Sequence, residues 1–509
     1  MFGVERNPNT EKPIGIDAIF QYAGSGVQFF SGMLFYLIMV RIFNPIEVGA
    51  IALFIAIVGL FNIVFSLGLG TAAQHFASYN VGRRDYNSAS KVFHKIILYG
   101  FSLATVGFFC LIILSPEVSL LFLHSAEYTR LVRFLSIVLF GNVLFGILNG
   151  VLLGLQDFKL SAIINIIIWI TYYFGTILLV FFIRDLFIII LGWSIGVFVG
   201  VVIQLISILR LISKFEKKDS AIQDIRLIRY SLPFLFSGIV SYGAAYSDRF
   251  IVASLLNLSS LGIYNFALLI ASSISFFATP FNNILMPKFS EMYGEGRTDE
   301  IAKQVKASSL LLNAIYVPSA LGISALSSIV LYVLGGPQYT VVSEPLSIIM
   351  FFSGAFISQH VIAQALASIR RNNAFIYSSI IALTCNIFLS FLLIPMYHLI
   401  GAAIAFSSVY SSTFFILLFY ASREGVFDFD MRSNIKVWIA AIIMFFSVIF
   451  STRFFGDSLL SLPFYILFGF IVYRILTNLL KVFKNESRDL IISIFPQRYK
   501  RLILLLFVD

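Results

Sequence analysis

The chain has 509 residues, of which 59% are hydrophobic and only 12% are Asp, Glu, Lys or Arg, with a net charge of +10. That charged share is about half of what soluble domains carry, and a single soluble core stops growing at about 250–300 residues. A water-soluble fold is therefore excluded, and lipid is the expected solvent for most of the chain.

Apolar runs of about 20 residues, the length of a membrane-spanning helix, follow one another along the sequence. They are too long for the strands of a β-barrel, which have about 10 residues and a period of two. They predict an all-α polytopic membrane protein with 14 transmembrane helices. The predicted spans are residues 17–40, 46–70, 92–114, 131–153, 161–183, 186–209, 230–255, 261–285, 307–333, 346–366, 376–396, 401–420, 435–452 and 459–480.

The basic residues lie mainly in alternate links between these spans. With the N-terminus inside, most of the 35 Lys and Arg residues are cytoplasmic, as the positive-inside rule requires. We therefore expect a multi-pass protein of the cell membrane with cytoplasmic N- and C-termini. The positive charge sets this orientation and attracts anionic membrane lipid, so nucleic acid is not an expected partner.

Three short motifs occur twice, in the same order and about 213 residues apart. Such a series indicates duplication. Because six helices separate equivalent positions, the halves are expected to be two parallel six-helix lobes related by an axis along the membrane normal. The pairs are Asn44–Gly49 with Asn257–Gly262, Tyr79–Asp85 with Tyr293–Asp299, and Tyr128-Thr129 with Tyr339-Thr340.

The duplication predicts how the chain is divided. Residues 1–209 form an N-terminal lobe, residues 210–229 a basic cytoplasmic linker, and residues 230–420 a C-terminal lobe. Residues 421–480 supply two helices outside the repeat. Residues 481–509 alternate basic and apolar blocks, which is typical of an amphipathic tail on the cytoplasmic surface.

Polar side chains within the predicted spans are candidates for a binding cavity. Asp17, Gln21 and Gln28 share one face of the first helix, and Asn165, Trp169 and Tyr172 share one face of the fifth. A Trp and a Tyr beside amides suit sugar rings. The alternative is helix packing, since such groups join membrane helices with about 0.6–2 kcal/mol each. The candidate substrate-binding residues are Asp17, Gln21, Gln28, Asn62, Asn165, Trp169, Tyr172, Asp248, Arg249 and Asn265.

Asp248 and Arg249 are the sharpest of these candidates. A charge inside a membrane helix costs about 2.5–3.5 kcal/mol, so it usually has a function. Adjacent helical residues point about 100° apart, so the two are not expected to be partners. Arg249 suits a phosphate, and Asp248 suits a coupling proton or cation. Pairing with other helices, or extension of the side chains to the surface, is the alternative.

The repeated Tyr-x-x-Gly-Arg-x-Asp motif places Arg83 and Asp85 in one half and Arg297 and Asp299 in the other. One interpretation is a pair of loop turns whose charge sets topology. The other is a cytoplasmic gate that opens and closes during transport. No grouping of His, Cys, Asp or Glu indicates a metal site, and no cofactor is expected.

Several of these motifs together resemble the polysaccharide (lipid-linked oligosaccharide) flippases of the multidrug/oligosaccharidyl-lipid/polysaccharide exporter superfamily. The resemblance covers roughly residues 15–420. The residues that carry it are Arg41–Gly49, Ser66–Gly70, Ser231–Pro233, Asp248-Arg249, Leu261–Tyr264, Pro287, Ile394-Pro395 and Gly401–Ala403.

This resemblance implies two six-helix lobes around a central cavity, two extra helices, and alternating access. The implied cargo is an oligosaccharide on a polyprenyl phosphate or diphosphate, carried from the cytoplasmic to the outer leaflet for cell-surface polysaccharide or glycan assembly. The implied partners are this lipid-linked oligosaccharide, membrane lipid and glycan-assembly enzymes, with H+ or Na+ as coupling ion. Arg83, Lys288 or Arg370 near the inner mouth could also meet the phosphate.

Two other functions fit parts of the sequence. A small-molecule or multidrug exporter would have the same architecture. A membrane enzyme acting on lipid-linked sugars would need an acid/base or metal cluster, and the longest outer link, about Ser115 to Thr129, has neither pattern. No phosphate-binding glycine motif lies between a strand and a helix, so the sequence favours transport over catalysis.

Overall fold

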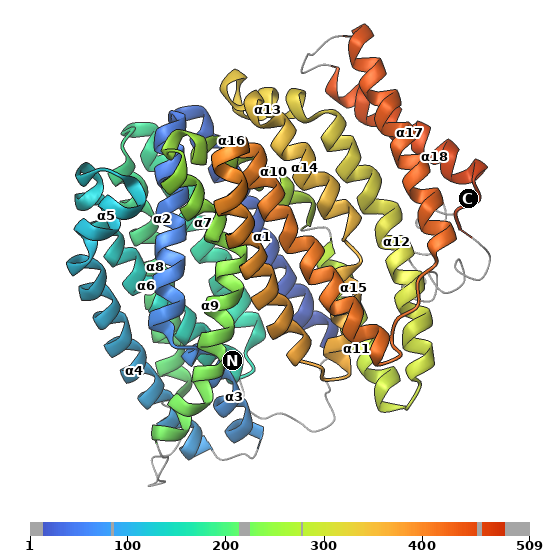
Figure 1. The fold of residues 1–509 in the computed structure, drawn as a ribbon. Coiled ribbons are helices and arrows are strands. Elements are labelled where there is room, and N and C mark those ends of the chain that lie inside the picture. The colour runs from blue at the N-terminus through green and yellow to red at the C-terminus, as the bar shows by residue number, and fades with distance from the viewer. Residues whose placement is uncertain (1–13, 83–85, 213–223, 276–277, 456–460, 484–509) are drawn as a thin grey trace. The chain divides into compact units, whose positions relative to one another are not determined.

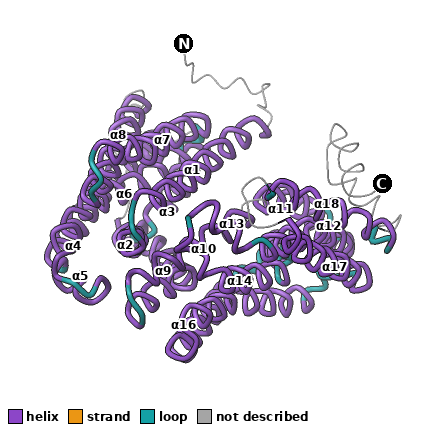
Figure 2. Tube along the Cα trace, turned by 90° about the horizontal axis from the view of Figure 1, so that it is seen from above, coloured by secondary structure: helices purple, strands orange, loops and turns teal. Residues whose placement is uncertain are grey.

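The computed structural model describes residues 14–82, 86–212, 224–275, 278–455 and 461–483, apart from some side chains next to the gaps. These residues form α-helices and short turns with no strand among them, which confirms the all-α prediction (Figure 1, Figure 2). The chain divides into two compact units, Met1–Ile239 and Val240–Asp509.

The first unit is organised around one long helix, α6. This helix packs against α2, α3, α4 and α8, while α1 packs on α7 and α7 on α8. The elements are α1 (Ile14–Ile42), α2 (Pro45–Ser66), α3 (Leu69–Gly82), α4 (Tyr86–Ile113), α5 (Ser115–Leu123), η1 (Ala126–Tyr128), α6 (Thr129–Gly154), α7 (Phe158–Phe182), α8 (Leu186–Ile212) and the first part of α9 (Asp224–Leu255).

The second unit contains the rest of α9 and the remaining helices. In it α12 packs against α14 and α17, and α16 against α14 and α15. The elements are α10 (Leu258–Ser275), α11 (Thr279–Gly294), α12 (Thr298–Ala325), α13 (Ser327–Gly335), η3 (Pro337–Val342), α14 (Ser343–Ala355), α15 (Gln359–Ser368), α16 (Asn373–Arg423), α17 (Met431–Phe455) and α18 (Leu462–Leu479).

Within the described residues, ten helices are long and apolar enough to cross a membrane, or eleven if the bent pair 337–355 and 359–368 counts as one span. A polytopic membrane protein is therefore confirmed, whereas fourteen spans and the arrangement of lobes stay predictions. Two predicted spans differ for physical reasons. Helix α9, which contains the predicted 230–255 span, is more polar than a typical span. The predicted 261–285 span is described as parts of α10 and α11, and residues 276–277 between them lie outside the described part of the chain.

Helix α16 is a hairpin that holds two of the predicted spans. Its 51 residues would extend about 77 Å if straight, more than twice the membrane core. The backbone reverses at His398, which has φ 49° and ψ −124°. Near the open end, the rings of Tyr377 and Tyr420 stack with centroids 6.3 Å apart, so the two arms run side by side (Figure 1).

The order of elements in the first half recurs in the second. Helices α4 and α12 have 28 residues each, and α5 and α13 have nine each. The repeated asparagines have the same local role. Asn44 accepts a hydrogen bond from the Glu47 backbone N–H at 3.0 Å, and Asn257 accepts one from Ser260 at 2.8 Å. Each caps the start of its helix, which explains physically why the motif recurs.

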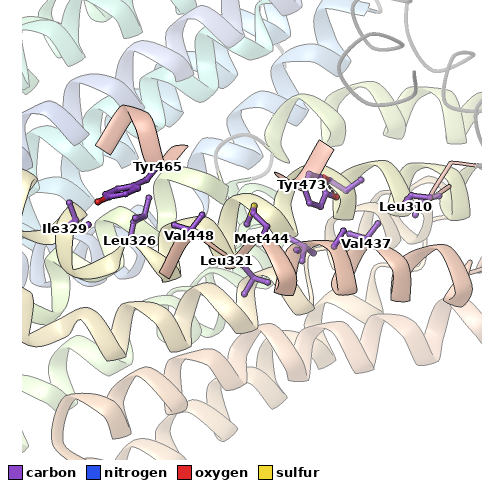
Figure 3. Close-up of a cluster of buried hydrophobic side chains, with 14 residues drawn as sticks. Leu310, Leu321, Leu326, Ile329, Val437, Met444, Val448, Tyr465 and Tyr473 are labelled. Carbon is purple, nitrogen blue, oxygen red and sulfur yellow. Dashed lines mark hydrogen bonds between the residues drawn. The ribbon is translucent and has the colours of Figure 1, made fainter. Parts of the chain in front are cut away.

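The last two described helices are fixed to the second unit by an apolar cluster between α12, α17 and α18 (Figure 3). Met444 and Val448 of α17 pack there against Leu321 of α12. The hydroxyl of Tyr473 on α18 donates to the Ala314 carbonyl oxygen at 2.9 Å. Helices α17 and α18 therefore belong to the core of this unit.

The boundary between the two compact units lies at residue 239, inside α9. The predicted divisions at residues 209, 229, 420 and 480 remain predictions. Most of the predicted basic linker and the predicted cytoplasmic tail lie outside the described residues.

The contact between α3 and α6 depends on glycine. A Cβ added at Gly150 would lie 2.1 Å from the Gly70 carbonyl oxygen, whereas one added at Gly146, one turn earlier, would meet nothing within 4 Å. Small residues allow such close backbone approach in membrane helices.

We predict that Gly150→Ala destabilises the protein by about 1–3 kcal/mol, because the new methyl group pushes α3 away from α6. Gly146→Ala is the matched control and should unfold at the wild-type temperature or slightly higher. Thermal unfolding of the two purified variants in detergent tests this, and equal midpoints would contradict it.

Candidate functional site

Amide side chains link three helices of the first unit. Gln21 of α1 donates from Nε2 to the Phe158 carbonyl oxygen at 2.8 Å. On α7, Ser161 donates to Asn149 Oδ1 of α6 at 2.9 Å, and Asn165 lies 3.5 Å from the same oxygen. Gln21 and Asn165 thus make packing contacts and remain only partly buried.

An aromatic cluster lies farther along α7. The ring of Trp169 stacks on Tyr173 at 5.7 Å, and that of Tyr172 stacks on Trp193 of α8, also at 5.7 Å. Phe35 of α1 completes the cluster against Tyr173 and Trp193. Trp169 is half-buried, whereas Tyr172 is 9% exposed. The structure therefore brings together the predicted Asn165, Trp169 and Tyr172, and only Tyr172 is enclosed by the packing.

The predicted face of the first helix is divided. Gln28 is exposed, while Gly24, one turn earlier on the same face, is buried against Ala162 and Asn165 of α7. The side chain of Asp17 lies outside the described residues. Asn62 on α2 is half-buried, and its Oδ1 has no hydrogen-bond partner among the described residues. Gln28 thus exposes its side chain to a ligand, whereas the unpaired Asn62 Oδ1 is enclosed by the surrounding residues.

We predict that Gln21→Leu lowers stability by about 0.6–1.7 kcal/mol, because it removes the bond to α7. Gln28→Leu should leave stability unchanged, because the exposed Gln28 side chain makes no such bond among the described residues. It should slow transport, because it removes an amide from the predicted cavity face of α1. Thermal unfolding and vesicle transport measure the two effects.

Ser25→Ala is the control, since its exposed hydroxyl bonds only within α1. Wild-type transport by a well-folded Gln28→Leu variant would remove Gln28 from the cavity lining.

The second unit buries the charged pair on α9. Asp248 is 0% exposed, and its Oδ1 lies 3.1 Å from Nη1 of Arg249, whose side chain is 13% exposed. The prediction that these neighbours would not pair is wrong. The long Arg249 side chain turns back along the helix, where Nη1 also contacts the Ala245 carbonyl oxygen.

Further groups hold the guanidinium in place. Arg249 donates from Nε to Asn265 Oδ1 of α10 at 3.1 Å, so the predicted Arg249 and Asn265 are in direct contact. The guanidinium carbon also lies 4.2 Å from the ring centre of Tyr246, a cation–π contact. Tyr246 stacks on Tyr242 one turn earlier at 4.4 Å.

The sequence analysis missed the groups beyond α9 and α10. Asn386 of α16 donates to the Ala244 carbonyl oxygen and to Ser247 Oγ, both at 3.3 Å. Tyr242 and Tyr246 of α9 were also missed, although their spacing of four residues beside Asp248 and Arg249 could have indicated them from the sequence. Asn386 had no such signal, because only the fold brings α16 to α9.

The predicted gate is described in its second copy only, because Arg83 and Asp85 lie outside the described residues. Arg297 contacts Glu295 and lies 2.8 Å from Glu300, and Asp299 is exposed. The hydrogen bond to the Glu295 carboxylate raises the pKa of Arg297, so the guanidinium stays charged. These contacts are local to the turn at Gly296, and a gate remains a prediction.

Within the described residues, no group of three or more His, Cys, Asp or Glu side chains could hold a metal ion.

The family model described as polysaccharide biosynthesis protein matches residues 38–344, more than half of the chain. The chain belongs to this family. It is 24% identical over 477 residues to the probable low-salt glycan biosynthesis flippase Agl15 of Haloferax volcanii, covering 93% of this chain and 96% of that protein.

Two solved structures show the same fold. The lipid II flippase MurJ in its inward closed conformation matches with a TM-score of 0.70 and 18% identity, over 91% of this chain and 98% of that one. An inward-facing multidrug transporter of the MATE family matches with a TM-score of 0.64 and 15% identity, over 78% and 94%. The family predicted from the sequence is thus confirmed, and the solved structures show the fold that the resemblance implied. The relative and the two neighbours are named as flippases and transporters rather than as enzymes.

Proposed function

We propose that the protein flips a polyprenyl phosphate- or diphosphate-linked oligosaccharide from the cytoplasmic to the outer leaflet by alternating access, for assembly of a cell-surface polysaccharide or glycan. The observation that carries this proposal is the match over 93% of the chain to a protein named as a glycan biosynthesis flippase. Both termini would be cytoplasmic, and glycan-assembly enzymes would supply and consume the cargo.

The site geometry supports a sugar-bearing cargo. Trp169 presents a half-buried aromatic ring one turn from the amide of Asn165, and Gln28 exposes an amide for hydrogen bonds. Sugars need donors and acceptors as well as flat apolar faces, and this set offers both. Arg249 would meet the phosphate only by exchanging its present contacts.

Asp248 is the proposed coupling group. Its Oδ1 binds Arg249, but its Oδ2 is buried without a hydrogen-bond partner among the described residues. The hydroxyl of Tyr264 donates to the Ala402 carbonyl oxygen at 3.3 Å and also interacts with the Asp248 carboxylate. Leaving a buried carboxylate oxygen unpaired is costly. A proton or Na+ would remove that cost, so an ion gradient could favour one conformation over another.

We predict that vesicles containing the purified protein expose a fluorescent polyprenyl-diphosphate oligosaccharide to an external sugar-modifying reagent faster than empty vesicles do. No exchange with any carrier under imposed H+ and Na+ gradients, together with export of a cationic dye, would instead favour a multidrug exporter. The MATE-like fold is the observation that keeps this second function open.

We also predict that Asp248→Asn slows flipping about tenfold, equivalent to ~1.4 kcal/mol, and abolishes its response to an ion gradient. The variant should fold, because Arg249 keeps its contacts with Asn265 and Ala245. Glu117→Gln, which removes an exposed carboxylate, is the control and should transport normally. A well-folded Asp248→Asn variant with a normal gradient response would refute coupling through this residue.

A further inference from the structure

Helix α3 of the first unit carries a polar face that lines a cavity. Thr71, Gln74, His75, Ser78 and Tyr79 follow one another at steps of three and one, so they share one side of the helix. With Tyr230 of α9 they line an open, shallow cavity of about 550 Å³ at the surface of the first unit. None of these six side chains is a carboxylate, a lysine or an arginine. None belongs to the predicted substrate-binding set.

The floor of this cavity is aromatic and fixed. The imidazole of His75 stacks on the ring of Tyr230, with centroids 4.6 Å apart and planes 17° from parallel. Phe76 meets the edge of the same ring at 5.2 Å, and Phe234 supports it at 5.5 Å. A flat surface therefore lies beside the polar side chains and does not depend on a ligand to form.

The backbone explains why α3 and Tyr230 stay together. Helix α2 ends at Ser66. The next two residues, Leu67 and Gly68, have φ of 48° and 69°, and α3 begins directly after them. A Cβ at Gly68 would lie 2.7 Å from the Ser231 carbonyl oxygen, so α9 packs closely on the break. The opposite face of α3 is buried, with Ala73 and Ala77 at 0% exposure. The polar face thus cannot turn inward.

An exposed polar face cannot be satisfied by hydrocarbon, so it must lie against water or a ligand. Gln74 and His75 are exposed, and Ser78 makes a bond of 3.3 Å to the Gly154 carbonyl oxygen. Breaks in membrane helices often lie beside a transporter's binding site. In the first unit, Leu67 and Gly68 break the chain between α2 and α3.

The duplication supplies an internal comparison. If Tyr79 is matched with Tyr293, then Thr71, His75 and Ser78 correspond to Leu285, Phe289 and Met292 of α11. Those three side chains are 0%, 0% and 6% exposed, and α11 packs against α15. The fold therefore does not require a polar face at this position. The other two positions are polar in both copies, because Gln74 corresponds to Lys288 and Tyr79 to Tyr293.

We propose that this cavity binds a sugar ring of the cargo headgroup. The proposal rests on the flippase function and deepens it. The amide, hydroxyl and imidazole groups both donate and accept hydrogen bonds, as sugar hydroxyls require, and the His75–Tyr230 stack offers an aromatic surface. A phosphate would need cationic side chains, and none of the six described lining residues is a lysine or an arginine.

The test compares carrier lipids with and without sugar. Full-length protein in lipid nanodiscs is titrated with a fluorescent polyprenyl diphosphate bearing a disaccharide and with the same lipid lacking it. His75→Phe installs the residue of the second copy and keeps an aromatic ring on Tyr230. Combined with Gln74→Leu, it should weaken binding of the glycosylated lipid about tenfold and leave the sugar-free lipid unchanged.

Ser290→Ala, on the exposed side of the equivalent helix α11, is the control and should bind both lipids normally. Tyr230→Leu, which removes the stacking surface, should reproduce the selective loss. Thermal unfolding checks that each variant folds. If Tyr230→Leu does not fold, the variant with Gln74→Leu and His75→Phe still tests the proposal, because both of its positions are exposed.

Equal weakening of both lipids would show a lipid or phosphate site and overturn the sugar assignment, as would unchanged binding in folded variants. Wild-type protein that neither binds nor flips any glycosylated lipid would refute the flippase proposal itself. If the wild-type protein flips the glycosylated lipid and the variants flip and bind it equally well, only the sugar site would be refuted.

Discussion

Hydrocarbon offers no hydrogen-bond partner, and this constraint governs the whole chain. Every backbone group within the membrane must be satisfied locally, so the described residues are helical, and each polar side chain in a helix needs a partner or water. Gln21 meets a carbonyl of α7, Arg249 meets Asn265, and Tyr473 meets a carbonyl of α12. Polar atoms that lack such a partner, as in Asn62 and Asp248, are therefore the informative ones.

Hydropathy, motif spacing and resemblance predicted the fold class, the membrane environment, the family and a transport function. The repeat could also be predicted, because Asn44 and Asn257 cap equivalent helices. A cap needs an Asn at one fixed position before the helix, and such a position can be recognised in the sequence. Counting spans was harder. The breaks at Leu67-Gly68 and at His398 depend on the positive φ of one or two residues inside an apolar run. Hydropathy is averaged over about 20 residues, so it does not detect them.

The site residues were less predictable than the fold. Periodicity places side chains on a helical face, but it does not say whether that face meets another helix. Asn165 was predicted to line a cavity, and the structure shows it bonded within α6 and α7. The spacing argument also failed for Asp248 and Arg249, because a long, flexible guanidinium can reach a neighbour that Cβ directions separate. Tyr230 and His75 could not be joined from sequence, since the stack depends on α9 crossing the glycine break.

The hairpin of α16 has a consequence for membrane insertion. Its two arms of about 25 residues contact each other near the open end, through Tyr377 and Tyr420, and meet at a tip where Gly401 lies against the Leu393 carbonyl. If each arm is a span, as the sequence predicts, the pair would cross the bilayer twice and return to its starting side. The side of the membrane on which α17 begins would then not depend on when the α16 hairpin inserts into the bilayer. Delayed insertion during synthesis would leave the last two helices in their correct orientation.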